Sequence, residues 1–281
     1  MEKVKFTINE KIDLGKALRK ALPLLSNYQI EKLFKDKDVK VNGVRKTKTC
    51  ILKPADEVEA FYIANNEPWH EVVFDDENVL IVNKRAGIEV TSEDDRNLLD
   101  ILHLDYNELY AVHRIDRNTE GLVIFAKNKV AEAELLEAFK KRTIIKKYAL
   151  KVKGKVPIEA IKHRMYLKKF SENSKVLISE IKTSGYEEIV THFKLIKHLD
   201  NESVLEAELV TGKTHQIRAH MAHIGHFVIG DGKYGDVKIN KANKRKRQRL
   251  CAVKLNFNFD KNSPLYYLND ARIDVSYKFE I

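Results

Sequence analysis

Apolar residues near the start of the chain recur at intervals of three and four, which is the spacing of an amphipathic helix. The first set is Leu14, Ala17, Leu18, Ala21 and Leu22, and the second set is Ile30, Leu33 and Phe34. Ser26 and Gln29 stand ahead of the second set at the spacing of a capping box, in which each side chain satisfies a backbone N–H at the helix start. The pattern therefore predicts two short helices in this part of the chain.

A strand pattern follows these helices. Residues 39–44 read Val-Lys-Val-Asn-Gly-Val, and Asn-Gly between β-branched residues is the strongest local signal for a tight hairpin. Residues 56–62 alternate as a closing strand does. We therefore place a compact α/β unit at residues 1–62. Its many basic residues make either a solvated face or a surface that binds phosphate. They include Lys16, Arg19, Lys20, Lys32, Lys35, Lys40, Arg45, Lys46 and Lys48.

Residues 63–72 follow neither periodicity and include Pro68, which is typical of a linker. We place a second domain at residues 73–281, which is long enough to bury a large core. The unbroken apolar run at residues 79–82 predicts a buried strand. Asn128 predicts an N-cap for a helix over residues 129–141. The apolar face of this helix consists of Ala131, Leu135, Ala138 and Phe139.

Two later stretches combine a clear pattern with reactive side chains. Alternation over residues 144–154 puts Tyr148 on the face of Ile144, Leu150 and Val152, opposite Lys147, Lys151 and Lys153. A buried tyrosine is most often a core residue whose hydroxyl is satisfied. The alternating strand at residues 205–210 leads into a helical pattern with Ile217, Met221 and Ile224 inward. Arg218 borders this stripe, so it either faces solvent or reaches a buried carboxylate.

The segment Val112-His113-Arg114-Ile115-Asp116-Arg117-Asn118-Thr119-Glu120-Gly121 is the richest in candidate chemistry, and a β-branched run follows it directly. Such a polar segment is typical of a loop that delivers charged groups to the edge of a buried strand. Arg114 and Arg117 flank Asp116, and nearby cations favour the ionised form of a carboxylate. An ionised carboxylate can act as a nucleophile or a general base. The alternative is a surface loop whose charges pair with one another.

The composition of the chain limits the kinds of molecule that it is expected to bind. The chain has 281 residues and a formal net charge of +10. Nucleic acid is the polyanion that suits this excess, because we find no apolar span, signal peptide or amphipathic anchor for a membrane. Cys50 and Cys251 do not form a metal-type pair, and two cysteines in a chain of this length suit a reducing cytoplasm. The basic run at residues 241–249 predicts a loop that follows backbone phosphates.

Three motif-like patterns are rejected. The Gly-Lys-Thr at residues 212–214 lacks the first glycine of a phosphate-binding loop, since residue 207 is Ala. On a helix, His215 and His220 would be about 140° apart, which does not suit a shared metal ion. Residues 230–235 spell Gly-x-Gly-x-x-Gly, but a lysine-rich run follows instead of a helix. We therefore expect no nucleotide cofactor and no metal.

Residues 113–121 resemble the His-Arg-Leu-Asp-x-x-Thr-Ser-Gly signature of the RluA-type pseudouridine synthases, with Ile115 for Leu and Glu120 for Ser. Residues 212–220 resemble the family's Gly-Arg-Thr-His-Gln-Ile-Arg-x-His motif, with Lys213 for Arg. Weaker similarities lie at residues 84–87, where Arg85 replaces Pro, at Lys147-Tyr148-Ala149, and at residues 250–252, where Cys251 replaces His. Residues 1–62 resemble the S4 RNA-binding domain.

The resemblance implies an α+β fold: a small α/β S4-like RNA-binding domain, then a mainly antiparallel, mixed-sheet catalytic domain. It implies that Asp116 is the nucleophile or base, that Tyr148 lies against the target base and that Arg218 pairs with Asp116. Arg114 would fill the gap left by a flipped base. The other substrate-binding candidates are His113, Thr119, Lys213 and His215.

The predicted function is isomerisation of uridine to pseudouridine in structured RNA, with 23S ribosomal RNA as the first choice of substrate. We expect a cytoplasmic monomer that needs no cofactor. Because the target base lies within the RNA structure, it must be flipped out. Alternatives are a synthase acting on tRNA, an RNA-binding ribosome-assembly factor without turnover, and a metal-dependent RNA hydrolase. The absence of clustered carboxylates disfavours the hydrolase.

Overall fold

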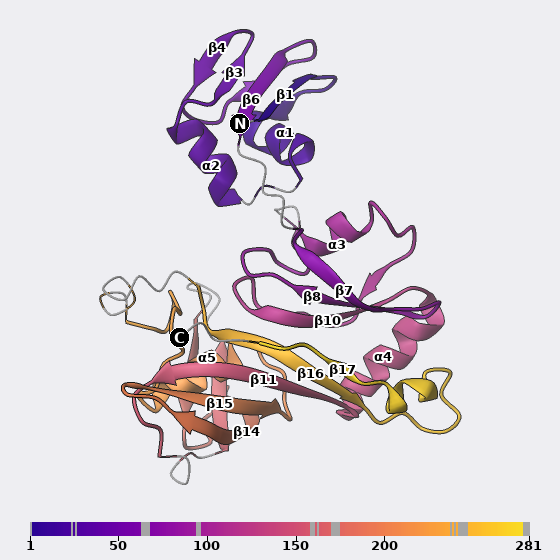
Figure 1. Cartoon of the computed structure of the whole chain (residues 1–281), viewed down its shortest axis with the longest axis vertical. Coiled ribbons are helices and arrows are strands. Elements are labelled where there is room, and N and C mark those ends of the chain that lie inside the picture. The colour runs from indigo at the N-terminus through magenta and orange to yellow at the C-terminus, as the bar shows by residue number, and fades with distance from the viewer. Residues whose placement is uncertain are drawn as a thin grey trace. The chain divides into compact units, whose positions relative to one another are not determined.

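The computed structural model describes residues 2–277 except 24, 26, 63–67, 94–96, 158–160, 162, 170–174, 237, 239 and 241–246. Ser26 of the expected capping box and most of the basic run at residues 241–249 lie outside the described residues. The chain forms two compact units (Figure 1). The first consists of residues 1–69 and 91–105, and the second of residues 70–90 and 106–281.

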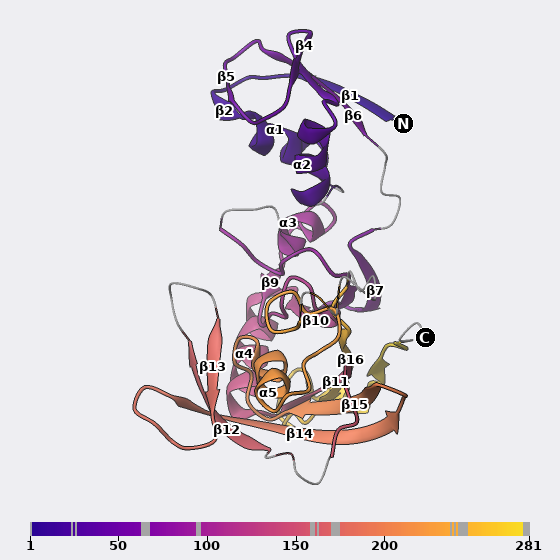
Figure 2. The ribbon, with the colours of Figure 1, turned by 90° about the vertical axis from the view of Figure 1, so that its left-hand side faces the viewer.

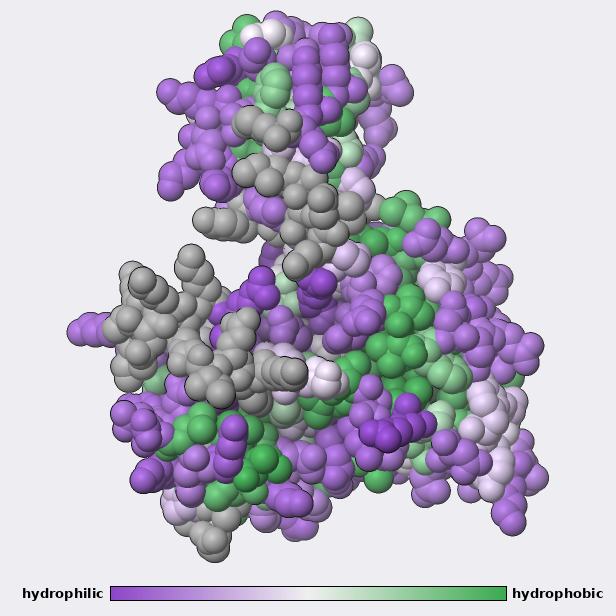
Figure 3. All heavy atoms as spheres, viewed as in Figure 1, coloured by the Kyte–Doolittle hydropathy of each residue, from purple (hydrophilic) through white to green (hydrophobic). Residues whose placement is uncertain are grey.

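The first unit is an α/β fold. Its elements are β1 (Glu2–Thr7), β2 (Ile12–Asp13), α1 (Leu14–Ala21), α2 (Asn27–Lys35), β3 (Val39–Val41), β4 (Val44–Lys46), β5 (Ile51–Leu52), β6 (Glu57–Tyr62) and α3 (Leu98–Leu102). An antiparallel sheet has the order β1-β6-β3-β4, and β2 pairs with β5. Asn42 and Gly43 have φ angles of 50° and 78°, as the predicted hairpin turn requires. Leu14, Leu18, Ile30 and Val58 lie in its core. The face visible in Figure 3 is mostly hydrophilic.

The sequence pattern did not predict β1 or the place of residues 91–105 in this unit. In β1 only Val4 and Phe6 pack against the core, while Lys3 and Lys5 form ion pairs with glutamates of β6. The predicted linker also ends too late, because its last three residues, 70–72, belong to strand β7. This strand lies at the sheet edge and leaves Val72 exposed, so its burial pattern is weak.

The second unit is built on a large, mainly antiparallel mixed sheet, as expected. Its strands are β7 (His70–Asp75), β8 (Val79–Lys84), β9 (Tyr110–Ala111), β10 (Glu120–Ala126), β11 (Ile144–Lys153), β12 (Arg164–Lys169), β13 (Val176–Ser179), β14 (Glu187–His198), β15 (Glu202–Leu209), β16 (Leu250–Phe257) and β17 (Ile273–Asp274). The main order is β13-β12-β14-β15-β11-β16-β10-β8-β7. Only β10 and β16 pair in parallel among the described strands.

Among the described residues, the complete helices of this unit are α4 (Lys129–Lys141), α5 (Gln216–His223) and a 3-10 helix over Tyr266–Asp270. Helix α4 has the predicted bounds and begins at the predicted cap, where the Asn128 side chain accepts from Ala131 N. Helix α5 lies inside the curve formed by β12–β15 (Figure 2), where Ala219 packs with Met165, Leu167, Val176 and Ile189. No helix in the described part of the chain is long and apolar enough to cross a membrane.

The parallel pairing of β10 and β16 depends on a glycine. Gly121 has a φ of 111°, and a Cβ at this position would lie 2.2 Å from the carbonyl oxygen of Ala252. Any larger residue would push the two strands apart. Gly121 thus lets the loop that carries Asp116 enter the middle of the sheet.

Candidate active site

Asp116 lies in the loop between β9 and β10, and buried residues on both sides fix this loop. Ile115 and Thr119 are 7% and 2% exposed. The Thr119 backbone N–H donates to the carbonyl of Asp116 at 3.0 Å, and Gln248 Nε2 donates to the Thr119 hydroxyl at 2.8 Å. The Asp116 side chain stays 24% exposed. It is therefore held firmly but remains accessible.

Lys84 supports the same loop from the end of β8. Its fully buried ammonium donates to the carbonyls of Arg85 and Ile88 at 2.9 Å and of Arg117 at 3.1 Å. Burial lowers the pKa of Lys84 to about 7, while three carbonyl acceptors match the three N–H donors of the ammonium form. The turn at residues 84–88 is thus bonded to the residue next to Asp116.

Arg218 pairs with Asp116, as the family resemblance implied. Its Nη1 donates to Asp116 Oδ2 at 2.8 Å. On the opposite edge of the guanidinium, Nε and Nη2 donate to the two carboxylate oxygens of Asp231 at 2.7 and 2.9 Å. Burial lowers the pKa of Arg218, but the bonds and charges of Asp231 and Asp116 raise it overall. One buried cation is therefore fixed between two carboxylates.

The cation bonded to Asp116 differs from the one expected from local sequence. Arg117 donates its Nε–H to the carbonyl of Gly87 at 3.2 Å instead of bonding to Asp116. Arg218 lies far along the chain from Asp116, so the pattern of charges around Asp116 cannot predict this pair. Helical periodicity left open that Arg218 reaches a buried carboxylate, and only the family resemblance identified that carboxylate as Asp116.

Sequence reasoning missed Asp231. This residue is fully buried and also accepts from the backbone N–H groups of Lys233 and Tyr234 at 2.8 and 3.1 Å. Burial raises the pKa of Asp231, but Arg218 and these backbone donors lower it overall. Asp231 lies in the Gly-x-Gly-x-x-Gly string that we rejected as a nucleotide site. The string instead forms a turn that holds Arg218.

The same turn orients His215. Tyr234 Oη accepts from Val176 N at 2.9 Å and lies 2.9 Å from His215 Nδ1. The Tyr234 ring centroid is 5.3 Å from Arg218 Cζ, within the range of a cation–π contact. Burial, with a contribution from the Arg218 charge, lowers the pKa of His215 to about 4. The imidazole is therefore neutral at pH 7.

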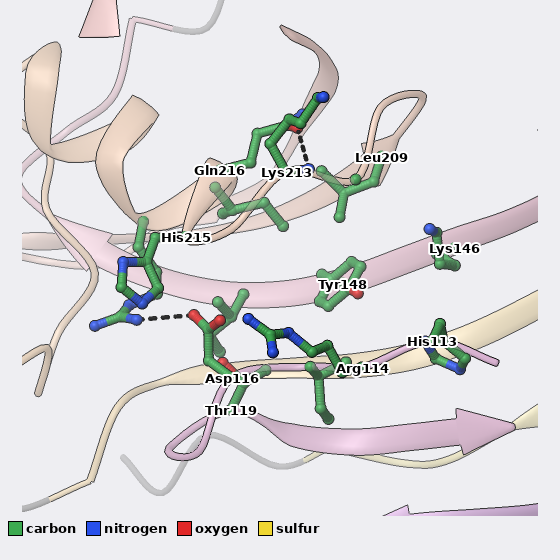
Figure 4. Close-up of a pocket in the computed structure, with 15 residues that line it drawn as sticks. His113, Arg114, Asp116, Thr119, Lys146, Tyr148, Leu209, Lys213, His215 and Gln216 are labelled. Carbon is green, nitrogen blue, oxygen red and sulfur yellow. Dashed lines mark hydrogen bonds and ion pairs between the residues drawn. The ribbon is translucent and has the colours of Figure 1, made fainter. Parts of the chain in front are cut away.

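Tyr148 is 6% exposed and lies on β11 facing the Asp116 loop. Burial and the charge of Asp116 raise its pKa, so the phenol keeps its proton at neutral pH. Figure 4 shows the side chains of Tyr148 and Arg114 directed into the space beside the Asp116 carboxylate. A phenol here can offer both an aromatic face and an O–H group to a ligand.

All eight predicted site residues line one cavity of about 300 Å³. They are His113, Arg114, Asp116, Thr119, Tyr148, Lys213, His215 and Arg218. Lys146 also lines it and was missed, although strand alternation places it on the Tyr148 face. Some of the predicted substrate-binding groups already have protein partners: His113 Nε2 accepts from Ile124 N at 2.9 Å, and Lys213 forms an ion pair with Glu187.

Two histidines of the 215–226 segment, His215 and His226, bond to separate groups. His215 contacts Tyr234, whereas His226 Nδ1 lies 2.8 Å from the Lys153 carbonyl oxygen. Within the ranges that the structure describes, His, Cys, Asp and Glu form no group of three or more that could hold a metal ion.

Replacing Asp231 with Asn is expected to lower the free energy of unfolding by about 3 kcal/mol or more, because Arg218 loses a buried counter-charge. Activity should also fall, since the guanidinium is no longer fixed toward Asp116. The stability difference from wild type should be full at pH 7 and should shrink as the pH falls below about 4, the usual pKa of an aspartate in an unfolded chain, toward the lowered pKa of folded Asp231. Thermal unfolding across this pH range measures it. Asp116→Asn is the matched control, because it removes the more exposed partner of Arg218 and should cost less stability.

Comparison with known proteins agrees with this geometry. Residues 78–223 match the RNA pseudouridylate synthase family. A ribosomal large subunit pseudouridine synthase C from Rickettsia felis is 30% identical over 253 residues, covering 80% of this chain and 82% of that protein. An uncharacterized RNA pseudouridine synthase from Mycoplasma capricolum is 31% identical over 300 residues, covering 96% of each chain.

A solved structure has the same fold. Human RNA pseudouridylate synthase domain containing 1 superposes with a TM-score of 0.60 at 22% identity, covering 74% of this chain and 83% of that chain. The matched residues 78–223 include Asp116, Tyr148 and Arg218. The chain therefore belongs to the RluA-type RNA pseudouridine synthases, the isomerases that convert uridine to pseudouridine in RNA.

Proposed function

We propose that this synthase modifies uridine in the RNA of the large ribosomal subunit, acting as a cytoplasmic monomer. The names of its relatives in Rickettsia felis and Zymomonas mobilis support this substrate, since both are ribosomal large subunit pseudouridine synthases. The net charge of +10 suits a large polyanionic substrate.

The observation that carries the assignment of the site is the Asp116–Arg218 pair at the wall of a cavity of about 300 Å³. This volume is at the lower end of the range for small-molecule sites, which suits one flipped-out base. In the reaction the bond between N1 and the ribose C1′ breaks, the uracil turns and a bond forms between C5 and C1′. C5 then loses its proton and N1 takes one up. No electron is gained or lost, so no redox cofactor is required.

Each site residue receives a role in this proposal. Asp116 acts either as the nucleophile, which attacks the ribose or the uracil ring, or as the general base that takes the C5 proton. Arg218 pairs with the Asp116 carboxylate and holds it oriented. Tyr148 lies against the uracil ring, and Arg114 occupies the gap that the flipped nucleotide leaves in the RNA. His113, Thr119, Lys213 and His215 shape the binding surface.

The substrate class is tested with transcripts of large-subunit RNA, small-subunit RNA and tRNA, each labelled with tritium at uridine C5. We expect the purified protein to release tritium from the large-subunit transcript at a rate at least about tenfold above the others, a difference of about 1.4 kcal/mol. Faster tritium release from tRNA would mean that tRNA is the substrate. If tritium were released from none of the three RNAs, the proposal that the protein modifies uridine in these RNAs would be contradicted.

The first unit is proposed to be an S4-like RNA-binding domain. Deleting it would be a poor test, because buried Leu98 and Leu102 belong to the same unit and would remain in the truncated chain. A cleaner test replaces three exposed lysines of this unit with Gln. These lysines are Lys16, Lys32 and Lys35.

This triple change is expected to weaken binding to a large structured RNA by about tenfold at moderate salt, because each lost phosphate contact removes counterion release. Turnover of a short saturating RNA should change little. The control changes Lys194, Lys197 and Lys261 to Gln, which removes the same charge from exposed sites of the second unit. Equal losses from both triples would mean that the first unit makes no specific contribution.

A further inference from the structure

A second cavity, of about 540 Å³, adjoins the one that contains Asp116. The two cavities share the lining residues His113, Lys146, Leu209, Gly212 and Lys213. The second cavity continues past Phe139 and Arg142 at the end of α4. A ligand held at Asp116 can therefore extend into it without leaving the protein surface.

Lys146 lies at the junction of the two cavities. It is two residues before Tyr148 on the same face of β11 (Figure 4), so the two side chains begin about 7 Å apart. A Cβ on Gly212 would lie 3.3 Å from Lys146 Nζ, so this glycine leaves room around the ammonium. The distance from Tyr148 to Lys146 is comparable with the length of one nucleotide.

Lys146 differs from the neighbouring lysines in its partners. Lys147, on the opposite face of the strand, lies 3.0 Å from Glu206, and Lys213 pairs with Glu187. Among the described residues, no carboxylate pairs with Lys146; its Nζ lies 5.0 Å from the Phe139 ring centroid. Burial lowers the pKa of Lys146, and no anion offsets this effect. Burying a cation without a counter-charge costs stability.

The lining of the second cavity favours an anionic ligand at Lys146. Its two acidic residues already have partners, Glu187 with Lys213 and Glu188 with Arg164 at 3.5 Å. Arg142 also lines the cavity and has no carboxylate partner in the described structure. Phe139 already contacts the His113 ring, at 4.7 Å between centroids, as well as Lys146. Its ring is thus a poor platform for stacking, and the available chemistry is cationic.

We propose that Lys146 binds a backbone phosphate flanking the target uridine, so that the neighbouring nucleotide occupies the second cavity. This inference rests on the proposed function, because it assumes that the uridine enters beside Asp116 and Tyr148. Lys146 would then fix the register of the RNA strand and bring one particular uridine to Asp116.

The test compares Lys146→Met with the matched control Lys147→Met. Binding is measured by fluorescence anisotropy with a short RNA hairpin modified by the wild-type protein, in the Asp116→Asn background so that no turnover intervenes. Lys146→Met should weaken binding about tenfold and reduce the slope of log affinity against log salt by about 0.7, one phosphate on a single strand. Lys147→Met should leave both values near those of the background protein.

A coupling experiment identifies the phosphate. Two further hairpins carry an uncharged methylphosphonate in place of the phosphate on the 5′ or the 3′ side of the target uridine. One of these two hairpins should bind the Asp116→Asn protein about tenfold more weakly than the unmodified hairpin does. For that hairpin, adding Lys146→Met should cause no further loss of affinity, because the contact is already absent. The proposal would be overturned if, for both hairpins, the loss of affinity from Lys146→Met simply added to the loss from the methylphosphonate. It would also be overturned if Lys146→Met and Lys147→Met weakened RNA binding equally.

A stability measurement separates binding from folding. Because Met keeps the apolar length of the side chain without its buried charge, Lys146→Met should leave the melting temperature unchanged or raise it. A clear decrease would mean that Lys146 supports the fold, and it would overturn the proposal. Failure of the wild-type protein to modify any RNA would instead contradict the proposed function and is seen separately in the tritium assay.

Discussion

Replacing Asp116 with Asn is expected to reduce pseudouridine formation by about 10⁴-fold or more, as expected for loss of a group that takes part directly in bond making. The amide has nearly the same shape but cannot act as a nucleophile or accept a proton. RNA affinity should stay within about tenfold of wild type, because phosphate contacts from many Lys and Arg side chains dominate binding. Single-turnover tritium release from C5-labelled RNA measures the rate, and filter binding measures the affinity.

The control for this variant is Asp274→Asn, which removes an exposed carboxylate of the same unit that pairs with Arg272 at 2.8 Å. Its rate should equal that of the wild type. Turnover by Asp116→Asn near the wild-type rate would exclude Asp116 as the reacting group.

Changes at Arg218 are expected to have the second-largest effect. Arg218→Lys keeps the charge but loses the planar fork that bonds to Asp116 and Asp231 together. We expect a rate loss of about 100-fold or more, the size seen when a fixed electrostatic partner is removed. Arg218→Ala should be slower still. Without the guanidinium the Asp116 carboxylate is no longer held in a fixed orientation, so the loss should lie in the rate at saturating RNA and not in RNA affinity.

The measurement is the single-turnover rate with RNA saturating and the chemical step limiting. Thermal unfolding must accompany it, because Arg218→Ala also leaves Asp231 buried without a counter-charge. Adding Asp231→Asn to Arg218→Ala removes that buried charge, and the double variant should stay as slow as Arg218→Ala. A rate near that of the wild type in a folded variant would contradict the role given to Arg218.

Local pattern predicted several of the helices and strands, while others, such as β12, β13, β14 and β16, were not predicted. Helix α4 has the predicted limits at Lys129 and Lys141, and the Asn42-Gly43 turn connects the two strands expected of it. Both features depend on neighbours in sequence, a side-chain cap in one case and two positive φ angles in the other. The burial of Tyr148 also followed from alternation along a single strand.

Features formed by distant segments were not accessible in this way. The parallel pairing of β10 with β16 brings Gly121 against Ala252, and no local periodicity encodes that contact. Lys84 reads as an ordinary polar residue at a strand end, yet its ammonium binds three carbonyls. The buried Asp231 was overlooked because its glycine-rich surroundings were tested only as a nucleotide motif. A lone Asp between glycines does not reveal which cation it will meet.

Mapping pseudouridine in total RNA of cells that lack this protein, or carry the wild type or Asp116→Asn, tests the central claim most directly. We predict that one or more pseudouridines of large-subunit ribosomal RNA disappear without the protein, return with the wild type and stay absent with Asp116→Asn. Restoration of these sites by Asp116→Asn, or a pseudouridine map that is the same with and without the protein, would contradict the account.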